Sequence, residues 1–265
     1  MVDHNSRYFI PTRLYGLVGH PLGHSFSKGF FTEKFKSEGI NASYLNFDLQ
    51  DLSELNGIIC ESPNLIGLNV TIPYKERILA LLDELDKTAE KIGAVNTIKI
   101  IRSENSEKRY RLIGFNTDII GFTESIAPAL SSSDRLALVL GSGGASKAIC
   151  MGLIELGISP KIVSRTKTSD SQLTYADLSS EIIASHTIIV NTTPLGMWPD
   201  INSCPDLPYD AITPDHVCFD AVYNPSPTKF LRQCAERGAT IIDGLEMLRL
   251  QALASWKIWN DDAAI

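Results

Sequence analysis

The stretch LALVLGSGGASKAI, Leu136–Ile149, constrains the fold more than any other part of the sequence. Its first residues, Leu136–Leu140, are all apolar, which is typical of a strand buried on both faces in a parallel sheet. The glycine turn GSGG follows at once, and Ala145–Leu156 then has the apolar spacing of a helix that Gly157 ends. A strand that runs through glycines into a helix begins a βαβ unit, so we expect a parallel sheet.

The rest of the C-terminal half repeats this alternation of short apolar runs and helical segments. The further strands and the clearest helix are predicted at Lys161–Val163, Thr187–Val190, Val217–Val222, Thr240–Ile242 and Pro227–Arg237. The pattern predicts a doubly wound parallel sheet with helices on both faces. Leu245–Trp259 has the spacing of one more amphipathic helix.

The N-terminal half, up to about Arg135, has its own set of elements. We predict strands at Leu14–Val18, Tyr44–Asp48 and Gly67–Ile72, helices at 27–38, Lys75–Ile92 and 117–130, and a hairpin of Ile98–Arg102 with Tyr110–Gly114. In Gly67–Ile72, apolar residues alternate with Asn69 and Thr71, which predicts one apolar and one polar face. Pro73 has no N–H group and ends the ladder. The sequence therefore predicts an α/β protein with two sheets.

The glycine turn has the form that dinucleotide-binding proteins place under a pyrophosphate. Gly141, Gly143, Gly144 and Ala145 permit a tight turn and a close backbone approach, and the helix N-terminus favours an anion. Ser146 stands where a third glycine or an alanine is common, and a small residue still fits. The alternative is an ordinary strand-to-helix turn. The strand–turn–helix context favours a dinucleotide site.

The end of the second strand indicates which dinucleotide is bound. A protein that binds NAD usually places an acidic residue there for the ribose hydroxyls. This chain instead has VSRTKT, with Ser164, Arg165, Thr166 and Lys167 and no acid. Arg165 can pair with a 2′-phosphate through both guanidinium arms and Lys167 adds charge, so we predict NADP. The alternative is that both cations are solvated loop residues.

Short polar clusters interrupt the apolar segments at separate points of the N-terminal half. They contain Ser25 and Ser27 in HSFS, Asn69, Thr71 and Lys75 in NVTIPYK, Asn96 in GAVNT, and Asn116, Thr117 and Asp118 in GFNTD. Each cluster also has a structural interpretation, because Ser and Asp cap helices and Asn favours turns. Together they offer hydroxyls, amides, one cation and one carboxylate, which suits a small polyhydroxylated acid.

Composition excludes several classes of protein. The net charge is −7, the pI is near 5.3 and no basic run is longer than two, so neither a nucleic-acid surface nor a polybasic membrane patch is expected. The sequence has no apolar stretch of membrane-spanning length and no signal-peptide core at its N-terminus. Its five cysteines lack C-x-x-C spacing, which favours a reducing cytoplasm and predicts neither disulfides nor a metal site.

The motifs taken together resemble the shikimate dehydrogenase family over nearly the whole chain and in the same order. They are GLVGHPLGHSFS, GLNVTIPYKE, IGAVNT, GFNTDIIGF, LGSGGASKA, VSRT, VNTTPLGM, FDAVYNPSPTKFL and IDGLEMLRLQA. The resemblance implies a substrate domain of residues 1–115 and 243–265 with a mainly parallel sheet, and a Rossmann-like NADP-binding domain of residues 116–242. It also implies that the last helix returns to the substrate domain, that the active site lies between the domains, and that the protein is a monomer or homodimer.

The resemblance also implies residue roles. Ser25 and Ser27 would bind the carboxylate of shikimate or 3-dehydroshikimate, and Lys75 and Asp118 would be the catalytic pair. The ring hydroxyls would contact Asn69, Thr71, Asn96, Asp118 and Gln251, with Tyr223 close by. The cofactor would contact Gly141, Gly143, Gly144, Ala145, Ser164, Arg165, Thr166, Lys167, Thr192 and Gly244. Lys75 can exchange a proton with the reacting oxygen or hold charge beside it, if burial and neighbours adjust its pKa.

Four positions depart from the family pattern or add an unexplained ionisable group. Lys28 stands where proline usually follows the serine pair, and it either assists carboxylate binding or points to solvent. His20 replaces a common asparagine, and we expect it to be structural. Ser164 replaces the asparagine of the usual NRT, which puts its own role in doubt more than that of Arg165. His24 has no partner that suggests a nucleophile–base pair, and we expect it to be structural as well.

Three alternatives to an NADP-dependent shikimate dehydrogenase remain at this point. A quinate/shikimate dehydrogenase would share the fold but tolerate quinate or NAD, although the serine pair favours shikimate. A catalytically silent ligand sensor would not need Lys75 and Asp118, which are both present. A methylene-tetrahydrofolate-type dehydrogenase would share the architecture but would not explain the serine pair.

Overall fold

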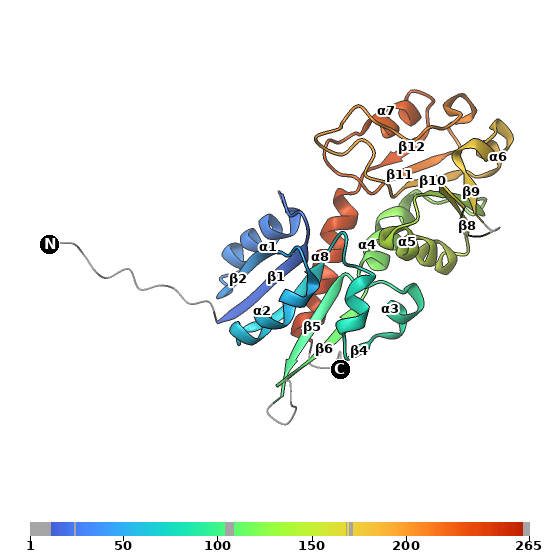
Figure 1. Ribbon diagram of the computed structural model, residues 1–265. Coiled ribbons are helices and arrows are strands. Elements are labelled where there is room, and N and C mark those ends of the chain that lie inside the picture. Colours follow the sequence, from blue (N-terminus) through green and yellow to red (C-terminus); the bar gives the residue numbers. More distant parts are fainter. Residues whose placement is uncertain (1–11, 24, 104–108, 168, 170–171, 262–265) are drawn as a thin grey trace. The chain divides into compact units, whose positions relative to one another are not determined.

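The computed structural model describes residues 12–23, 25–103, 109–167, 169 and 172–261. Two compact units account for the chain, and Figure 1 shows their elements coloured along the sequence. Unit 1 comprises residues 1–86, 95–115 and 258–265, and unit 2 comprises residues 87–94 and 116–257. His24, for which a structural role was expected, lies outside the described residues. No helix of the described ranges is long and apolar enough to cross a membrane.

Unit 1 is built on a mixed six-stranded sheet of order β2-β1-β3-β5-β6-β4. Its strands are β1 (Arg13–Gly19), β2 (Ala42–Asp48), β3 (Leu65–Val70), β4 (Glu84–Leu85), β5 (Thr97–Arg102) and β6 (Tyr110–Phe115). The pairs β1–β2, β1–β3 and β4–β6 are parallel, whereas β3–β5 and the predicted hairpin β5–β6 are antiparallel. Helices α1 (Phe26–Ser37) and α2 (Leu55–Glu61) and the 3-10 turns η1 (Leu52–Glu54) and η2 (Arg77–Leu81) complete the unit.

An aromatic core joins both ends of the chain in unit 1. The rings of Phe31 on α1 and Tyr44 on β2 stack with centroids 4.8 Å apart, and Tyr15 lies 4.9 Å from Trp259. The Trp259 indole donates to the carbonyl of Ile98 on β5 at 3.0 Å. Gly67 leaves the space for this indole, since a Cβ there would overlap it. The end of helix α8 (Leu245–Asn260) therefore returns to the first sheet, as expected.

The predicted helix Lys75–Ile92 is wrong. The structure has η2, the short strand β4 and a separate helix α3 (Lys87–Ile92) in its place. Asp83 exchanges backbone and side-chain bonds with Leu112, and the Asp86 N–H donates to the carbonyl of Gly114. These bonds attach the segment to β6, so pairing between distant parts of the chain outweighs the local helical pattern.

Strand β3 is displaced from its predicted bounds and ends at Val70. Thr71 still donates to the carbonyl of Val18, and the Ile72 carbonyl still accepts from His20, so contact with β1 continues past the strand. Ile72 was expected on the apolar face of the strand, but its side chain is 69% exposed and does not belong to a buried face. Asn69, expected on a polar face, is buried.

Unit 2 is an all-parallel six-stranded sheet of order β12-β11-β10-β7-β8-β9. Its strands are β7 (Leu136–Leu140), β8 (Ser159–Ser164), β9 (Leu173–Thr174), β10 (Ile188–Asn191), β11 (Val217–Asp220) and β12 (Thr240–Ile242). Its helices are α3, α4 (Asp118–Ile126), α5 (Gly144–Glu155), α6 (Ser180–Ser185), α7 (Lys229–Ala235) and most of α8, with η3 (Ala127–Ala129), η4 (Tyr175–Asp177) and η5 (Tyr209–Ala211).

Both faces of this sheet are covered, as the unbroken apolar strand predicted. Ala137 and Val139 of β7 pack with Phe122 of α4 and Leu153 of α5. Leu138 and Leu140 point the other way and pack with residues of α6 and α7. Gly157 follows α5 with φ +77°, a left-handed conformation that glycine adopts without strain, and ends the helix as expected.

The buried carboxyl group of Asp220 lies at the end of β11. It accepts from Thr228 Oγ1 at 2.6 Å, the Val222 N–H at 3.0 Å and Asn191 Nδ2 at 2.9 Å. Burial nevertheless raises its pKa to about 6, with the nearby Asp243 carboxylate adding to the rise. The folded protein therefore holds this proton more tightly than the unfolded chain does, and its contribution to stability is present at low pH and lost as the pH rises through about 6.

We expect Asp220→Asn to remove this pH dependence, because an amide keeps an acceptor for Asn191 and Val222 and does not ionise. The free energy of unfolding of wild type should decline relative to the variant by roughly 2 kcal/mol between pH 4 and pH 7. Urea unfolding of both proteins across this range measures the difference. A difference that stays constant with pH would contradict the raised pKa.

Ser146 on α5 is a second buried polar group, with an exposed fraction of 0%. Its hydroxyl has no nitrogen or oxygen partner within the described part of the chain, and its polar neighbour is the thiol of Cys150 one turn along. A buried hydroxyl without a full hydrogen bond is costly, and serine is also a poorer helix former than alanine. Serine at position 146 therefore lowers the free energy of unfolding relative to alanine.

We predict that Ser146→Ala raises the free energy of unfolding by about 1 kcal/mol. Ser255→Ala is the matched control, because Ser255 is an equally buried helical serine whose hydroxyl donates to the Gln251 carbonyl at 2.9 Å. That variant should be destabilised. Chemical denaturation measures both, and equal destabilisation of the two variants would mean that the Ser146 hydroxyl is satisfied.

Candidate functional site

Unit 1 contains a buried cluster of polar side chains, which we call the amide cluster: Ser27, Tyr44, Asn69, Asn96 and Thr97. None is more than 8% exposed. Asn69 Nδ2 donates to the Asn96 carbonyl and to Thr97 Oγ1, each at 3.2 Å, and Tyr44 donates to Asn69 Oδ1 at 2.8 Å. Thr97 Oγ1 also donates to Asn96 Oδ1 at 3.1 Å. The cluster brings together three residues that were predicted to bind substrate, Ser27, Asn69 and Asn96.

Tyr44 and Thr97 were not predicted as site residues. Tyr44 was predicted only as the first residue of the strand Tyr44–Asp48, and Thr97 appeared only as the last residue of the motif IGAVNT. A signal was present for Tyr44, because a buried phenol needs a hydrogen-bond partner. Its partner Asn69 lies 25 residues further on, a distance at which spacing in the sequence indicates nothing.

The predicted serine pair lies at the start of α1. Ser25 is the N-cap, and its hydroxyl accepts from the Lys28 N–H at 3.2 Å. Ser27 is buried one residue inside the helix, whereas Lys28 is exposed. The structural role considered for Ser25 is therefore present, and its O–H proton can still be donated to a ligand.

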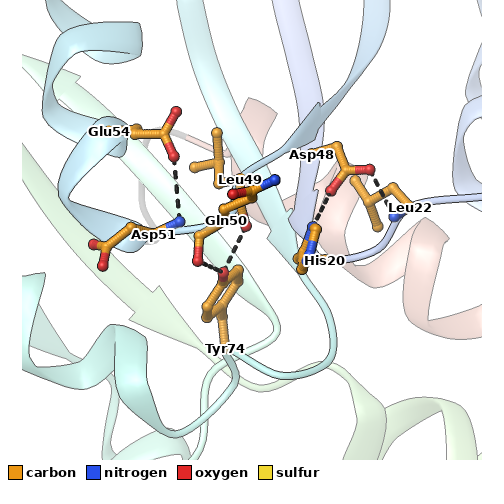
Figure 2. A network of polar contacts seen from close by, with 8 residues as sticks. All are labelled: His20, Leu22, Asp48, Leu49, Gln50, Asp51, Glu54 and Tyr74. Atoms are coloured by element: carbon orange, nitrogen blue, oxygen red, sulfur yellow. Dashed lines mark hydrogen bonds and ion pairs between the residues drawn. The ribbon is translucent and has the colours of Figure 1, made fainter.

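A carboxylate fixes the turn that leads into this helix. Asp48 at the end of β2 contacts His20 Nδ1 at 2.7 Å and accepts from the Leu22 N–H at 3.0 Å, as Figure 2 shows. The bond from His20, and then that from Leu22, keep the pKa of Asp48 below its ordinary value. His20 thus has a structural partner in Asp48.

Tyr74 supports the segment that carries Lys75. Its hydroxyl is directed at the Leu49 carbonyl at 2.5 Å and the Gln50 carbonyl at 3.0 Å, also seen in Figure 2. The Lys75 carbonyl accepts from the Val95 N–H at 2.8 Å, which links the segment to the strand edge beside Asn96. Lys75 and Thr71 are each partly exposed.

In unit 2, Asp118 and Gln251 belong to the facing helices α4 and α8. The Asn116 side chain bonds the Asp118 N–H at 3.1 Å and the Ala94 carbonyl at 2.9 Å. Thr117 Oγ1 lies 3.5 Å from Gln251 Oε1. Gly121 lets α8 approach, since a Cβ there would meet the backbone of Met247 and Gln251. Asp118 lies in unit 2 and Lys75 in unit 1, and their catalytic pairing stays a prediction.

The glycine turn after β7 has the form that a dinucleotide phosphate needs. Gly141 has φ +113°, which favours glycine, and a Cβ there would lie 2.5 Å from Thr192 Oγ1. Thr192 in turn donates to the Leu140 carbonyl at 2.7 Å. A Cβ on Gly143 would meet nothing within 4 Å, and no side chain hydrogen-bonds to cap the start of α5. The turn thus offers open space and N–H groups, which fits a pyrophosphate.

The end of β8 carries the predicted 2′-phosphate residues. Ser164 Oγ donates to the Thr166 carbonyl at 2.6 Å and closes the turn on which Arg165 and Thr166 are exposed. Lys167 pairs with Asp177 at 3.0 Å. Asp177 also accepts from the Thr174 N–H and hydroxyl, and these bonds with that from Lys167 lower its pKa to about 2. Arg165 is thus the more available cation for a phosphate.

Two further predicted residues lie in the segment between β11 and α8. Gly244 donates to the Val222 carbonyl at 3.3 Å, and a Cβ there would overlap the Ala221 carbonyl, so glycine is required. Tyr223 is partly buried, and burial raises the pKa of its phenol. Among the residues that the structure describes, no group of acidic, histidine and cysteine side chains is arranged to hold a metal ion.

Comparison with known proteins agrees with this arrangement. Residues 17–98 match the family model of the shikimate dehydrogenase substrate binding domain. The shikimate dehydrogenase (NADP(+)) of Methanococcus maripaludis is 38% identical over 264 residues, which cover 94% of this chain and 91% of the relative.

Two solved structures extend the comparison to the fold. The shikimate 5-dehydrogenase of Thermus thermophilus, in complex with NADP(H) and shikimate, has a TM-score of 0.79, 32% identity, and coverage of 94% of this chain and 93% of its own. The quinate dehydrogenase of Corynebacterium glutamicum, in complex with NAD, has a TM-score of 0.81 at 25% identity, with coverage of 94% and 93%. The chain resembles these proteins over nearly its full length, and its glycine turn and motifs occur in the expected order. The chain therefore belongs to the shikimate dehydrogenase family.

Proposed function

We propose that the protein is an NADP-dependent shikimate dehydrogenase that interconverts 3-dehydroshikimate and shikimate in aromatic amino acid biosynthesis. The observation that carries this proposal is the likeness, over 94% of the chain, to a solved structure that holds both NADP(H) and shikimate. The amide cluster and the exposed Arg165 supply groups of the right chemistry for each of these two ligands. The five free cysteines favour a reducing cytoplasm as its location, and we infer a monomer or homodimer.

The proposal assigns the substrate to residues of both units. Ser25 and Ser27 bind the carboxylate, since hydroxyl donors suit an anion at the start of a helix. The ring hydroxyls contact Asn69, Thr71, Asn96, Asp118 and Gln251, and Tyr223 lies near them. These side chains offer both donors and acceptors, as a polyhydroxylated ring requires.

Oxidation of a secondary alcohol removes a hydride from carbon and a proton from oxygen. NADP, held by the glycine turn, Thr192, Gly244 and Ser164–Lys167, would supply the hydride acceptor. Lys75 exchanges the proton with the reacting oxygen or stabilises charge there, and Asp118 orients both. The same groups act in reverse when the ketone is reduced.

We expect Lys75→Ala to lower kcat by about 100-fold or more, as loss of an acid–base group does, with little change in shikimate binding. Arg77→Ala is the control, because it removes an exposed cation two residues away. Steady-state kinetics and equilibrium binding measure the two effects. A variant that loses affinity but keeps kcat would make Lys75 a binding residue.

We expect Arg165→Ala to raise the KM for NADP by about tenfold, the effect of losing one charge-assisted bond, and to leave the KM for NAD nearly unchanged. Lys161→Ala removes a cation from β8, away from the turn that carries Arg165, and should change neither KM. Equal effects of Arg165→Ala on both cofactors would exclude Arg165 from 2′-phosphate recognition.

One alternative within the family has a specific observation in its favour. The quinate dehydrogenase of Corynebacterium glutamicum has the same fold at a TM-score of 0.81. A quinate/shikimate dehydrogenase would oxidise both acids or use NAD. Assays of shikimate and quinate with NADP and NAD separate the two functions, and no turnover of shikimate with either cofactor would reject both.

A further inference from the structure

The last residues of strands β10 and β11, Asn191 and Asp220, form a buried pair in unit 2. They lie opposite each other in register, and both are 0% exposed. Asn191 Nδ2 donates to Asp220 Oδ1 at 2.9 Å. Ligands of open α/β sheets bind outside the carboxyl ends of the strands, which is where this pair lies. The pair therefore joins the starts of two segments that leave the sheet at that edge, the β10 loop (residues 192–195) and the β11 loop (residues 221–228).

Each member of the pair also fixes the loop that follows its own strand. Asn191 Oδ1 accepts from the Thr193 N–H at 3.0 Å and from the Thr193 hydroxyl at 2.6 Å. Asp220 Oδ1 accepts from the Val222 N–H at 3.0 Å, and Asp220 Oδ2 accepts from Thr228 Oγ1 at 2.6 Å. The two bonds to backbone N–H groups are Asx turns, which supply partners beyond the ends of the strands. The β11 loop is thus held near its start and at its end.

The Thr193 N–H determines the orientation of the Asn191 amide. A backbone N–H can only donate, so Oδ1 must face Thr193 and Nδ2 must face Asp220. In the same way the Leu231 N–H donates to Thr228 Oγ1 at 3.3 Å, and this hydroxyl gives its one proton to Asp220. Hydrogen bonds from both loops therefore end on one carboxylate. An amide in its place would lose the bond from Thr228.

Three residues that the proposed function assigns to ligands adjoin this pair. Thr192 follows Asn191 directly, and its N–H and hydroxyl donate to the last carbonyl of β7 at 2.9 and 2.7 Å. Tyr223 follows Val222, whose carbonyl accepts from the Gly244 N–H at 3.3 Å. Thr192 and Gly244 are proposed contacts of the cofactor, and Tyr223 is proposed to lie near the substrate. A shift of either loop would therefore displace a residue of the proposed ligand site.

We propose that Asn191 and Asp220 are positioning residues for the dinucleotide, whose shared hydrogen bond holds the β10 and β11 loops in the arrangement that binds NADP. The inference rests on the proposed function. Both side chains are fully buried and do not contact the cofactor, so they act through Thr192 and Gly244. A pair with a merely structural role would lower the free energy of unfolding and leave the NADP affinity of the folded protein unchanged.

Asn191→Ala removes the shared bond and leaves Asp220 in place. We expect the Kd for NADP to rise about tenfold, since the loss of one hydrogen bond to a charged group has this effect on an equilibrium. Isothermal titration calorimetry without substrate, below the unfolding transition of each protein, measures the Kd. The free energy of unfolding is measured in parallel by urea denaturation.

Thr228→Val is the second variant, because it removes one bond to Asp220 and retains the branched side chain. We expect it to raise the Kd for NADP about threefold, whereas Thr228→Ser keeps the hydroxyl and should bind NADP as wild type does. Thr187→Val is the matched control. Thr187 Oγ1 donates to Asp134 Oδ1 at 2.6 Å, so the same kind of bond is lost at the opposite edge of the same sheet. This control should be destabilised and should keep the wild-type Kd.

A wild-type Kd in Asn191→Ala or in Thr228→Val, or an equal rise in Thr187→Val, would overturn the inference. If Asn191→Ala does not fold, the comparison of Thr228→Val with its two partners decides. A wild-type protein that binds NADP but does not oxidise shikimate would overturn the proposed function, while the Kd values of the variants still decide the positioning role. A wild-type protein that does not bind NADP would overturn both.

Discussion

The buried side-chain amide of Asn69 is the interaction on which the first unit's polar interior depends. A buried side-chain amide has two N–H donors and one oxygen acceptor. If these groups lack hydrogen-bond partners, the amide destabilises the fold more than an apolar residue would. Tyr44 on β2, and Thr97 and the Asn96 carbonyl at the start of β5, supply these partners from two other segments. Once they do, hydrogen bonds as well as packing constrain the positions of β2, β3 and β5, and the orientation of the Asn69 amide is fixed.

In the second unit, glycines allow segments of backbone to approach their neighbours closely, as the proposed binding of a dinucleotide requires. Two of its glycines, Gly141 beside Thr192 and Gly244 beside Ala221, are placed where the neighbouring chain leaves no room for a Cβ. Side chains also fix two of its turns: Thr192 donates to the Leu140 carbonyl and Ser164 donates to the Thr166 carbonyl. The serine that replaces asparagine in the SRT motif thus acts within its own turn and leaves Arg165 exposed.

Sequence reasoning succeeded where the cause of structure is local. The unbroken apolar run of β7, the glycine turn and the spacing of α5 lie within one stretch, and all three appear as predicted. The segment 75–92 failed because Asp83 and Asp86 bond to residues of β6 about 30 positions away. Tyr44 was missed for a related reason, since a tyrosine in a predicted strand indicates no site residue until its distant hydrogen-bond partner is known. Ser25 shows that a helix cap and a predicted ligand contact can be the same residue.

The contact of Trp259 with Gly67 and Ile98 also bears on how the chain is made. Unit 1 begins near the N-terminus, yet the indole that completes its aromatic core comes from residues almost at the other end. A ribosome must therefore have synthesised residue 259 before this core can close, whereas the sheet of unit 2 needs the chain only as far as β12. The aromatic core of the unit that begins first along the chain can consequently close only after the strands of the second sheet have been synthesised.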